Sequence, residues 1–174
     1  MVAKRLSLKR FKSDADGAAA LEFALVAPIL FFIFMAILEV SIMFFASANI
    51  DGAAIEAARR IRTGQAQSSG DATTDFYDTL CGLLSSSINC GNVFYDARTV
   101  ATFTSVNLET TYDPDTGEPI TYGFAAGGAE DIVVVRVMYY WDFATPLIGS
   151  YLDNTGTGKR LLASTVVFQN EPYE

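Results

Sequence analysis

The sequence predicts an α+β protein in which a long N-terminal helix crosses a membrane and continues as a stem packed against a small antiparallel β-sheet domain. Three observations support this fold class. Residues 23–38 carry no charge, apolar side chains recur at helical spacing in residues 50–61, and the second half contains segments rich in β-branched and aromatic residues. A chain of 174 residues leaves room for one modest core.

The N-terminal end differs in charge from the rest of the chain. Residues 1–17 contain five Lys or Arg and two Asp, whereas the formal net charge of the whole chain is −8. An acidic body repels nucleic acid, so we expect no nucleic-acid partner. The basic residues directly precede an apolar run, and no Lys or Arg follows until Arg59. This asymmetry predicts a cytoplasmic N-terminus and an exported C-terminal domain, with lipid as a partner.

The apolar run is long enough to span a bilayer. Phe23 to about Phe45 meets the roughly 20 residues that a transmembrane helix needs. The alternative is a buried helix of a soluble protein, which usually carries a polar stripe, whereas residues 31–35 place apolar side chains on every side. Pro28 lies inside the run and cannot donate to the carbonyl of Ala24, which predicts a kink there.

Small residues precede the apolar run instead of following it. In a secretory signal they mark a cleavage site after the apolar core. Here Gly17-Ala18-Ala19-Ala20 lies before the core, so a cut there would remove the leader and keep the span. If the cut falls between Gly17 and Ala18, the new amine lies one helical turn from Glu22 and could neutralise it. The alternative is that Glu22 merely lies at the headgroup level.

These residues resemble a known family. A basic leader, Gly17, Glu22, Phe23 and an apolar helix are similar to the short-leader processing motif of type IV prepilins, as in Flp pilins and the TadE-like and TadF-like pseudopilins of tight-adherence (Tad) systems. The resemblance implies that a prepilin peptidase cuts after Gly17, that Ala18 is the new terminus, and that Glu22 and Phe23 are the Glu-aromatic pair that guides assembly. It covers residues 17–66 and includes a second intramembrane glutamate, Glu39.

The resemblance also implies a function. Major Flp pilins are usually very short, so a chain of this length resembles a TadE-like minor pseudopilin in tight-adherence pilus biogenesis, in initiation, assembly or capping. The implied partners are the prepilin peptidase, other pseudopilins, the major Flp-type pilin and the inner-membrane pilus platform. The implied location is the bacterial inner membrane, with the C-terminal domain in the periplasm or in the extracellular pilus. The segment "ASTVVFQNEPYE" resembles the closing strand of such proteins, whereas residues 68–128 match nothing specific.

The membrane helix is expected to continue into water. Apolar residues recur at i, i+3, i+4 and i+7 on one face, mostly as alanine, and arginines follow near residue 60. Arginine suits the negative end of a helix, and Gly64 can end it. We therefore expect three parts: a leader at residues 1–17, a transmembrane and stem helix at 18–64, and an exported α+β domain at 65–174.

The exported domain is predicted from weaker signals. Residues 65–74 are expected to form a loop and residues 76–84 a helix. Strands are expected at residues 100–112, 120–124, 132–143 and 161–169, with a turn at 113–119. Cys81 and Cys90 are an even pair in an oxidising compartment, which favours a disulfide over free thiols.

Little in the sequence indicates catalysis or ligand binding, so we expect no enzyme activity, no cofactor and no metal. The chain has no histidine, which excludes Ser-His-Asp and Cys-His chemistry. Residues 113–119 lack the spacing of a calcium loop, and residues 153–160 lack that of a phosphate loop. Tyr139, Tyr140, Trp141 and Phe143 could stack a ligand, but core and interface packing is favoured.

Two other functions remain open from the sequence. One is a signal-anchored periplasmic module that binds or senses a ligand without entering a pilus. The other is an anchored hydrolase that uses paired carboxylates such as Asp113, Asp115 and Glu118, for which no catalytic spacing can be named.

Overall fold

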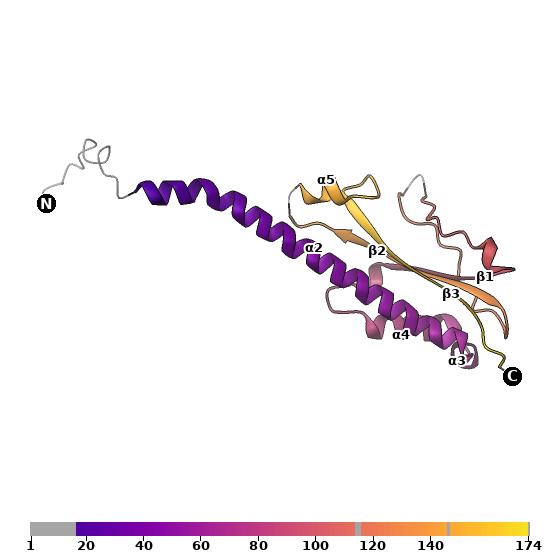
Figure 1. Cartoon of the computed structure of the whole chain (residues 1–174). Helices are drawn as coiled ribbons and strands as arrows, with labels where there is room; N and C mark the ends of the chain where they lie inside the picture. Colours follow the sequence, from indigo (N-terminus) through magenta and orange to yellow (C-terminus); the bar gives the residue numbers. More distant parts are fainter. Residues whose placement is uncertain (1–16, 114–115, 146, 174) are drawn as a thin grey trace, which may run out of the picture. The chain divides into compact units, whose positions relative to one another are not determined.

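The computed structural model describes residues 17–113, 116–145 and 147–173. Residues 1–16, which hold nearly all of the predicted leader and its basic residues, and Asp115 of the turn therefore lie outside the described residues. The chain forms two compact units, one that ends at Leu38 and one from Glu39 to Glu174. The predicted stem helix, Ala18–Arg62, contributes to both units and is labelled α2 (Figure 1).

In the first unit, α2 is long and apolar enough to cross a membrane, and it is the one such helix among the described residues. Its large apolar side chains between residues 21 and 38 are 38–69% exposed, whereas those of a soluble core helix would be buried. So much contiguous apolar surface suits lipid. The structure is therefore compatible with a single-pass membrane anchor. Pro28 lies inside α2, and its kink stays a prediction.

In the second unit, residues 39–62 of α2 form one side of the core. The predicted alanine-rich face is buried, and each of its members is at most 2% exposed: Ile50, Ala53, Ala54, Ala57, Ala58 and Ile61. The helix ends at Arg62, two residues before the predicted limit at residue 64, and the chain turns at Gly64 with φ +76°. A Cβ at Gly64 would lie 2.7 Å from Cγ of Tyr173, so both the backbone angle and the packing require glycine.

The predicted loop at residues 65–74 is wrong, because two helices occupy most of it. α3 spans Gln65–Ser68 and α4 spans Ala72–Leu83. The carboxylate of Asp71 accepts hydrogen bonds from the N–H groups of Thr73 and Thr74, so α4 begins four residues earlier than predicted. The polar composition reflects a helix cap and an exposed helix face, both of which resemble a loop in sequence.

α4 runs antiparallel to α2. Nε of Arg60 donates to Asp75 at 2.8 Å near the end of α2, and Asn49 bonds to the carbonyl of Leu83 and the N–H of Ser85 farther back. These polar contacts flank an apolar contact in which Phe76 and Leu80 are fully buried in the same core as the alanine face.

The sheet has three antiparallel strands in the order β1-β2-β3, namely Val93–Val100, Ile132–Asp142 and Lys159–Gln169 (Figure 1). β2 and β3 confirm two predicted strands. β1 pairs with β2 from Val93↔Tyr139 to Val100↔Ile132, and β2 pairs with β3 from Ile132↔Gln169 to Asp142↔Lys159. The observed α+β architecture, a long apolar helix with a small antiparallel sheet, confirms the predicted fold class.

Two predicted strands are wrong. After Val100 the chain forms a 3₁₀ turn at Phe103–Ser105, and residues 106–111 have no regular structure. Residues 120–124 contribute one isolated bridge, Ala97↔Phe124. These segments have β-propensity, but they cover a face of the sheet and form no continuous ladder. The true first strand was missed because Asp96 and Arg98 interrupt its apolar pattern.

β2 is buried on both faces. Val133, Val135 and Val137 belong to the core shared with α2 and α4. On the other face, Arg136 forms a buried ion pair with Asp96 of β1, and it also donates to the carbonyl of Ile120 at 3.1 Å. The pair therefore connects the central strand to the irregular segment that covers it.

We expect Asp96→Asn to lower the free energy of unfolding by about 3–5 kcal/mol, because it leaves the Arg136 charge buried without its partner. The matched control is Asp142→Asn, which removes the exposed pair with Lys159 and should cost less than about 1 kcal/mol. Urea unfolding of the detergent-solubilised protein measures both. Equal effects of the two variants would contradict a structural role for the buried pair.

Candidate processing and assembly site

The predicted scissile bond lies at the point where α2 begins. Gly17 is an exposed turn residue whose carbonyl accepts the N–H of Leu21 at 3.1 Å, and the helix starts at Ala18. No atom of the described residues lies within 4 Å of a Cβ built on Gly17. The described part of the chain therefore leaves the bond between Gly17 and Ala18 open to an enzyme.

Glu22 and Phe23 follow on the first turns of α2. Both are exposed, and Glu22 lies four residues after Ala18, one helical turn along the same side. The Ala18 amine exists only after a cut, so the pairing of Glu22 with that amine stays a prediction.

Glu39 lies in a different environment from Glu22. It is 8% exposed, and its carboxylate accepts the backbone N–H of Ala144 and, at 2.8 Å, that of Thr145. Glu39 therefore fixes the segment after β2 to α2 within the second unit, while its predicted role in assembly stays a prediction.

The sequence did not reveal the partner of Glu39. The two groups are 105 residues apart, and the partner is a pair of backbone N–H groups, which any residue type supplies. The one available signal was a single carboxylate within a long apolar run, since a buried carboxylate requires hydrogen-bond donors.

We expect Glu39→Leu to remove the protection of the Ala144 and Thr145 amides from hydrogen exchange, because both lose their acceptor. Glu39→Gln retains one acceptor oxygen and should leave partial protection. Asp51→Asn, an exposed acidic position on the same helix, is the control and should leave both amides unchanged. Amide exchange followed by mass spectrometry gives the result, and unchanged protection in Glu39→Leu would contradict this assignment.

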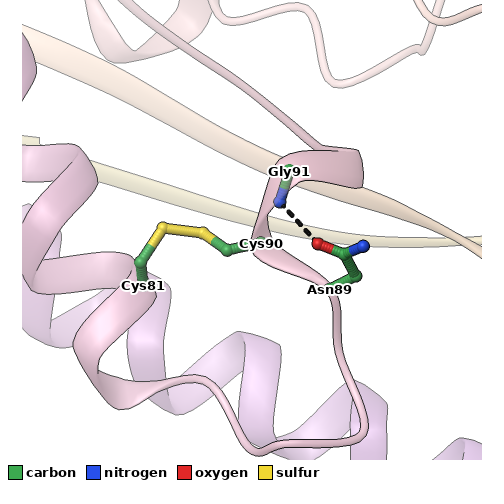
Figure 2. Close-up of a disulfide and its surroundings, with 4 residues drawn as sticks. All are labelled: Cys81, Asn89, Cys90 and Gly91. Atoms are coloured by element: carbon green, nitrogen blue, oxygen red, sulfur yellow. Dashed lines mark hydrogen bonds between the residues drawn. A yellow bond between two sulfur atoms is a disulfide. The ribbon is translucent and has the colours of Figure 1, made fainter.

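The predicted disulfide is present. Cys81 of α4 bonds to Cys90, with 5.7 Å between the Cα atoms (Figure 2). Cys90 begins a 3₁₀ turn, Cys90–Asn92, in which Oδ1 of Asn89 accepts the N–H of Gly91 at 3.0 Å. The bridge thus joins the end of α4 to the residues that lead into β1.

We expect alkylation of Cys81 and Cys90 to require prior reduction, which a mass shift on the denatured protein detects. Replacing both with serine should lower the free energy of unfolding by about 2–3 kcal/mol, because the closed loop is short. Alkylation of the oxidised protein without reductant would contradict the bridge.

In the two loops that resemble ligand sites in sequence, polar groups form hydrogen bonds with other groups of the same loop. In residues 153–160, the carboxylate of Asp153 accepts the N–H groups of Thr155, Gly156 and Gly158 at 2.6–2.9 Å. The N–H of Thr155, followed by that of Gly158, holds the pKa of Asp153 below its usual value. These N–H groups therefore already have an anionic partner in the chain.

The turn at residues 113–119 also closes on itself. The N–H of Asp113 donates to the carbonyl of Glu118 at 2.8 Å, and Gly117 adopts a φ of +71°. Within the described ranges, no group of three or more His, Cys, Asp or Glu side chains is placed to hold a metal ion.

The aromatic cluster at the end of β2 is part of the packing. Tyr139, Trp141 and Phe143 pack against the core, and the hydroxyl of Tyr140 donates to the carbonyl of Gly117 at 2.7 Å. The predicted packing role is confirmed for Tyr139, Trp141 and Phe143, whereas Tyr140 contacts the 113–119 turn instead of this core.

The comparisons concern the segment that contains the processing motif. The family model described as TadE-like protein matches residues 17–59. This segment is TadE-like. The match confirms the resemblance predicted from the sequence and supports a part in the tight-adherence pilus system. The TadE-like segment begins at Gly17, includes Glu22 and Glu39, and ends before Gly64, so it does not extend to the sheet. The chain has no significant match among curated proteins or among solved structures.

Proposed function

We propose that this chain is a TadE-like minor pseudopilin, without catalytic activity, that acts in the initiation, assembly or capping of a tight-adherence pilus at the inner membrane. The observation that carries the proposal is the order of features in the TadE-like segment. An exposed glycine directly precedes a 45-residue helix, and that helix carries a glutamate on its second turn and an apolar surface up to Leu38.

The proposed mechanism is lateral helix packing in the bilayer. A prepilin peptidase removes residues 1–17, and the new amine of Ala18 neutralises Glu22 in the same chain or in a neighbouring subunit. Two charges that are costly near hydrocarbon are then paired, which favours one register between neighbouring helices. The exported domain, held to residues 39–62 of the same helix, is available to other pseudopilins, the major pilin or the pilus platform.

The topology follows from the charge asymmetry. The basic leader remains in the cytoplasm and the C-terminal domain lies in the periplasm, or in the pilus if the subunit polymerises. The Cys81–Cys90 disulfide supports an oxidising compartment for that domain.

We expect the mature protein to begin at Ala18, because the cut after Gly17 creates the amine that assembly needs. N-terminal sequencing of the membrane-bound protein measures this. Gly17→Leu should block the cut and abolish piliation, whereas Gly52→Ala, at an exposed helical glycine with open space around it, should not. A native product that still starts at residue 1, or normal piliation in Gly17→Leu, would support the anchored binding module instead.

We expect Glu22→Gln to leave cleavage intact but to reduce the number of assembled pili several-fold, because the amide keeps the shape of the side chain and loses the charge. Glu56→Gln, which removes an exposed charge from the same helix, serves as the control. Pili are counted by electron microscopy alongside N-terminal sequencing. Equal pilus numbers in the two variants would exclude the proposed pairing.

A further inference from the structure

A short segment of the exported unit presents apolar side chains to its surroundings. It consists of residues 147–152, which include α5 (Ile148–Leu152), and is called the foot (Figure 1). Tyr151 is 84% exposed and Leu147 is 69% exposed. They are four residues apart, and the foot contains no charged residue. Two large apolar groups this exposed on a fixed segment cost free energy in water.

The foot is held in place by its own hydrogen bonds. Oγ of Ser150 donates to the carbonyl of Leu147 at 2.7 Å, and Nη1 of Arg160 donates to the carbonyl of Leu152 at 2.9 Å. A Cβ on Gly149 would lie 2.9 Å from the carbonyl oxygen of Gly158, so α5 packs closely on the next loop. Leu147 has a φ of +70°, a strained angle for a branched side chain. The fold therefore holds an exposed leucine in an unfavourable backbone conformation.

Glu39 holds the segment that leads into the foot. The N–H groups of Ala144 and Thr145, just before the foot, bond to the Glu39 carboxylate. Glu39 directly follows the uncharged run of residues 23–38, which is about 24 Å long at 1.5 Å per residue, so a hydrocarbon core of about 30 Å that begins at Phe23 ends near Ile42. The bilayer boundary then falls within about one helical turn of Glu39, the residue to which the segment before the foot is bonded.

We propose that the foot is a second membrane contact, which inserts Leu147 and Tyr151 at the boundary between the acyl chains and the headgroups of the phospholipid bilayer. This inference rests on the proposed membrane anchoring. Tyrosine suits this depth because its ring is apolar and its hydroxyl is polar. Ile42, Phe44 and Phe45 of α2 are also 50–65% exposed, so exposed apolar side chains continue on the helix just after Glu39.

A lipid surface fits the foot better than a protein partner. Two exposed side chains are far smaller than the roughly 1,000 Å² that a stable protein interface buries. The charged groups beside the foot have partners within the chain: Asp153 accepts N–H groups of its own loop, Arg160 donates to the carbonyl of Leu152, and Lys159 pairs with Asp142 at 2.9 Å. The expected chemistry is shallow apolar insertion into a zwitterionic membrane.

The test uses the full-length protein in phosphatidylcholine vesicles with one environment-sensitive fluorophore on an engineered cysteine. Both native cysteines are in the disulfide, so the new thiol alone is labelled. Tyr151→Cys reports on the foot, and Ile33→Cys reports on the span. Phe103→Cys is the matched control, because Phe103 is 55% exposed and follows the Val100↔Ile132 end of the sheet, ten residues along β2 from Asp142.

The proposal predicts that lipids brominated near the carbonyl end of their acyl chains quench the label at 151 several-fold more than the label at 103. The label at 33 is tested with lipids brominated near the methyl end of their chains, because it lies near the middle of the span. Quenching at 33 by these lipids, together with equal quenching at 151 and 103 by the shallow ones, overturns the foot and leaves the membrane anchor intact. No quenching at 33 by either lipid overturns the anchor and the foot with it. A label at 151 that neither brominated lipid nor aqueous iodide quenches is covered by protein, which also overturns the lipid contact.

Discussion

The packing of the alanine-rich face of α2 against the sheet is the contact on which the rest of the exported unit depends. Ala54 and Ala57 are fully buried in the same core as Val135 and Val137. Alanine loses no side-chain entropy on burial and leaves no bulky group between the helix and its neighbours. Larger side chains at these positions would overpack the core, so residues 39–62 of α2 and the sheet form one structural element.

Buried polar groups complete this element. Most of its irregular segments are attached by side chains that accept or donate several hydrogen bonds. Glu39 holds the segment after β2, Arg136 and Asp96 hold the cover of the outer sheet face, and Asn170 donates to the carbonyls of Ala126 and Gly128. Each of these groups would be costly to bury alone, so each makes its segment's position specific.

The two parts of α2 therefore lie in different environments. Up to Leu38 its apolar side chains are exposed in the described chain, and from Glu39 onward one face is covered by the exported unit. The change occurs at a carboxylate, the side chain that is least suited to hydrocarbon and best suited to backbone N–H donors. In the proposed pseudopilin, Glu39 lies near the end of the membrane segment, and Glu22 remains available for contacts between subunits.

The sequence by itself determined the features that depend on neighbouring residues. The length of α2, its end just before Gly64, its buried alanine face and strands β2 and β3 were readable from periodicity, glycine and apolar runs of adjacent residues. The similarity to TadE-like proteins was recognised from the motif of Gly17, Glu22, Phe23 and the apolar helix. Only the tertiary structure decided the position of β1, the absence of a ladder in residues 106–111, and the partner of Glu39. These features depend on contacts between residues 40 to 105 positions apart in the sequence, such as that of Asp96 with Arg136. Such contacts override local propensity, because a buried charge is stable only next to its partner, however far away in the sequence that partner lies.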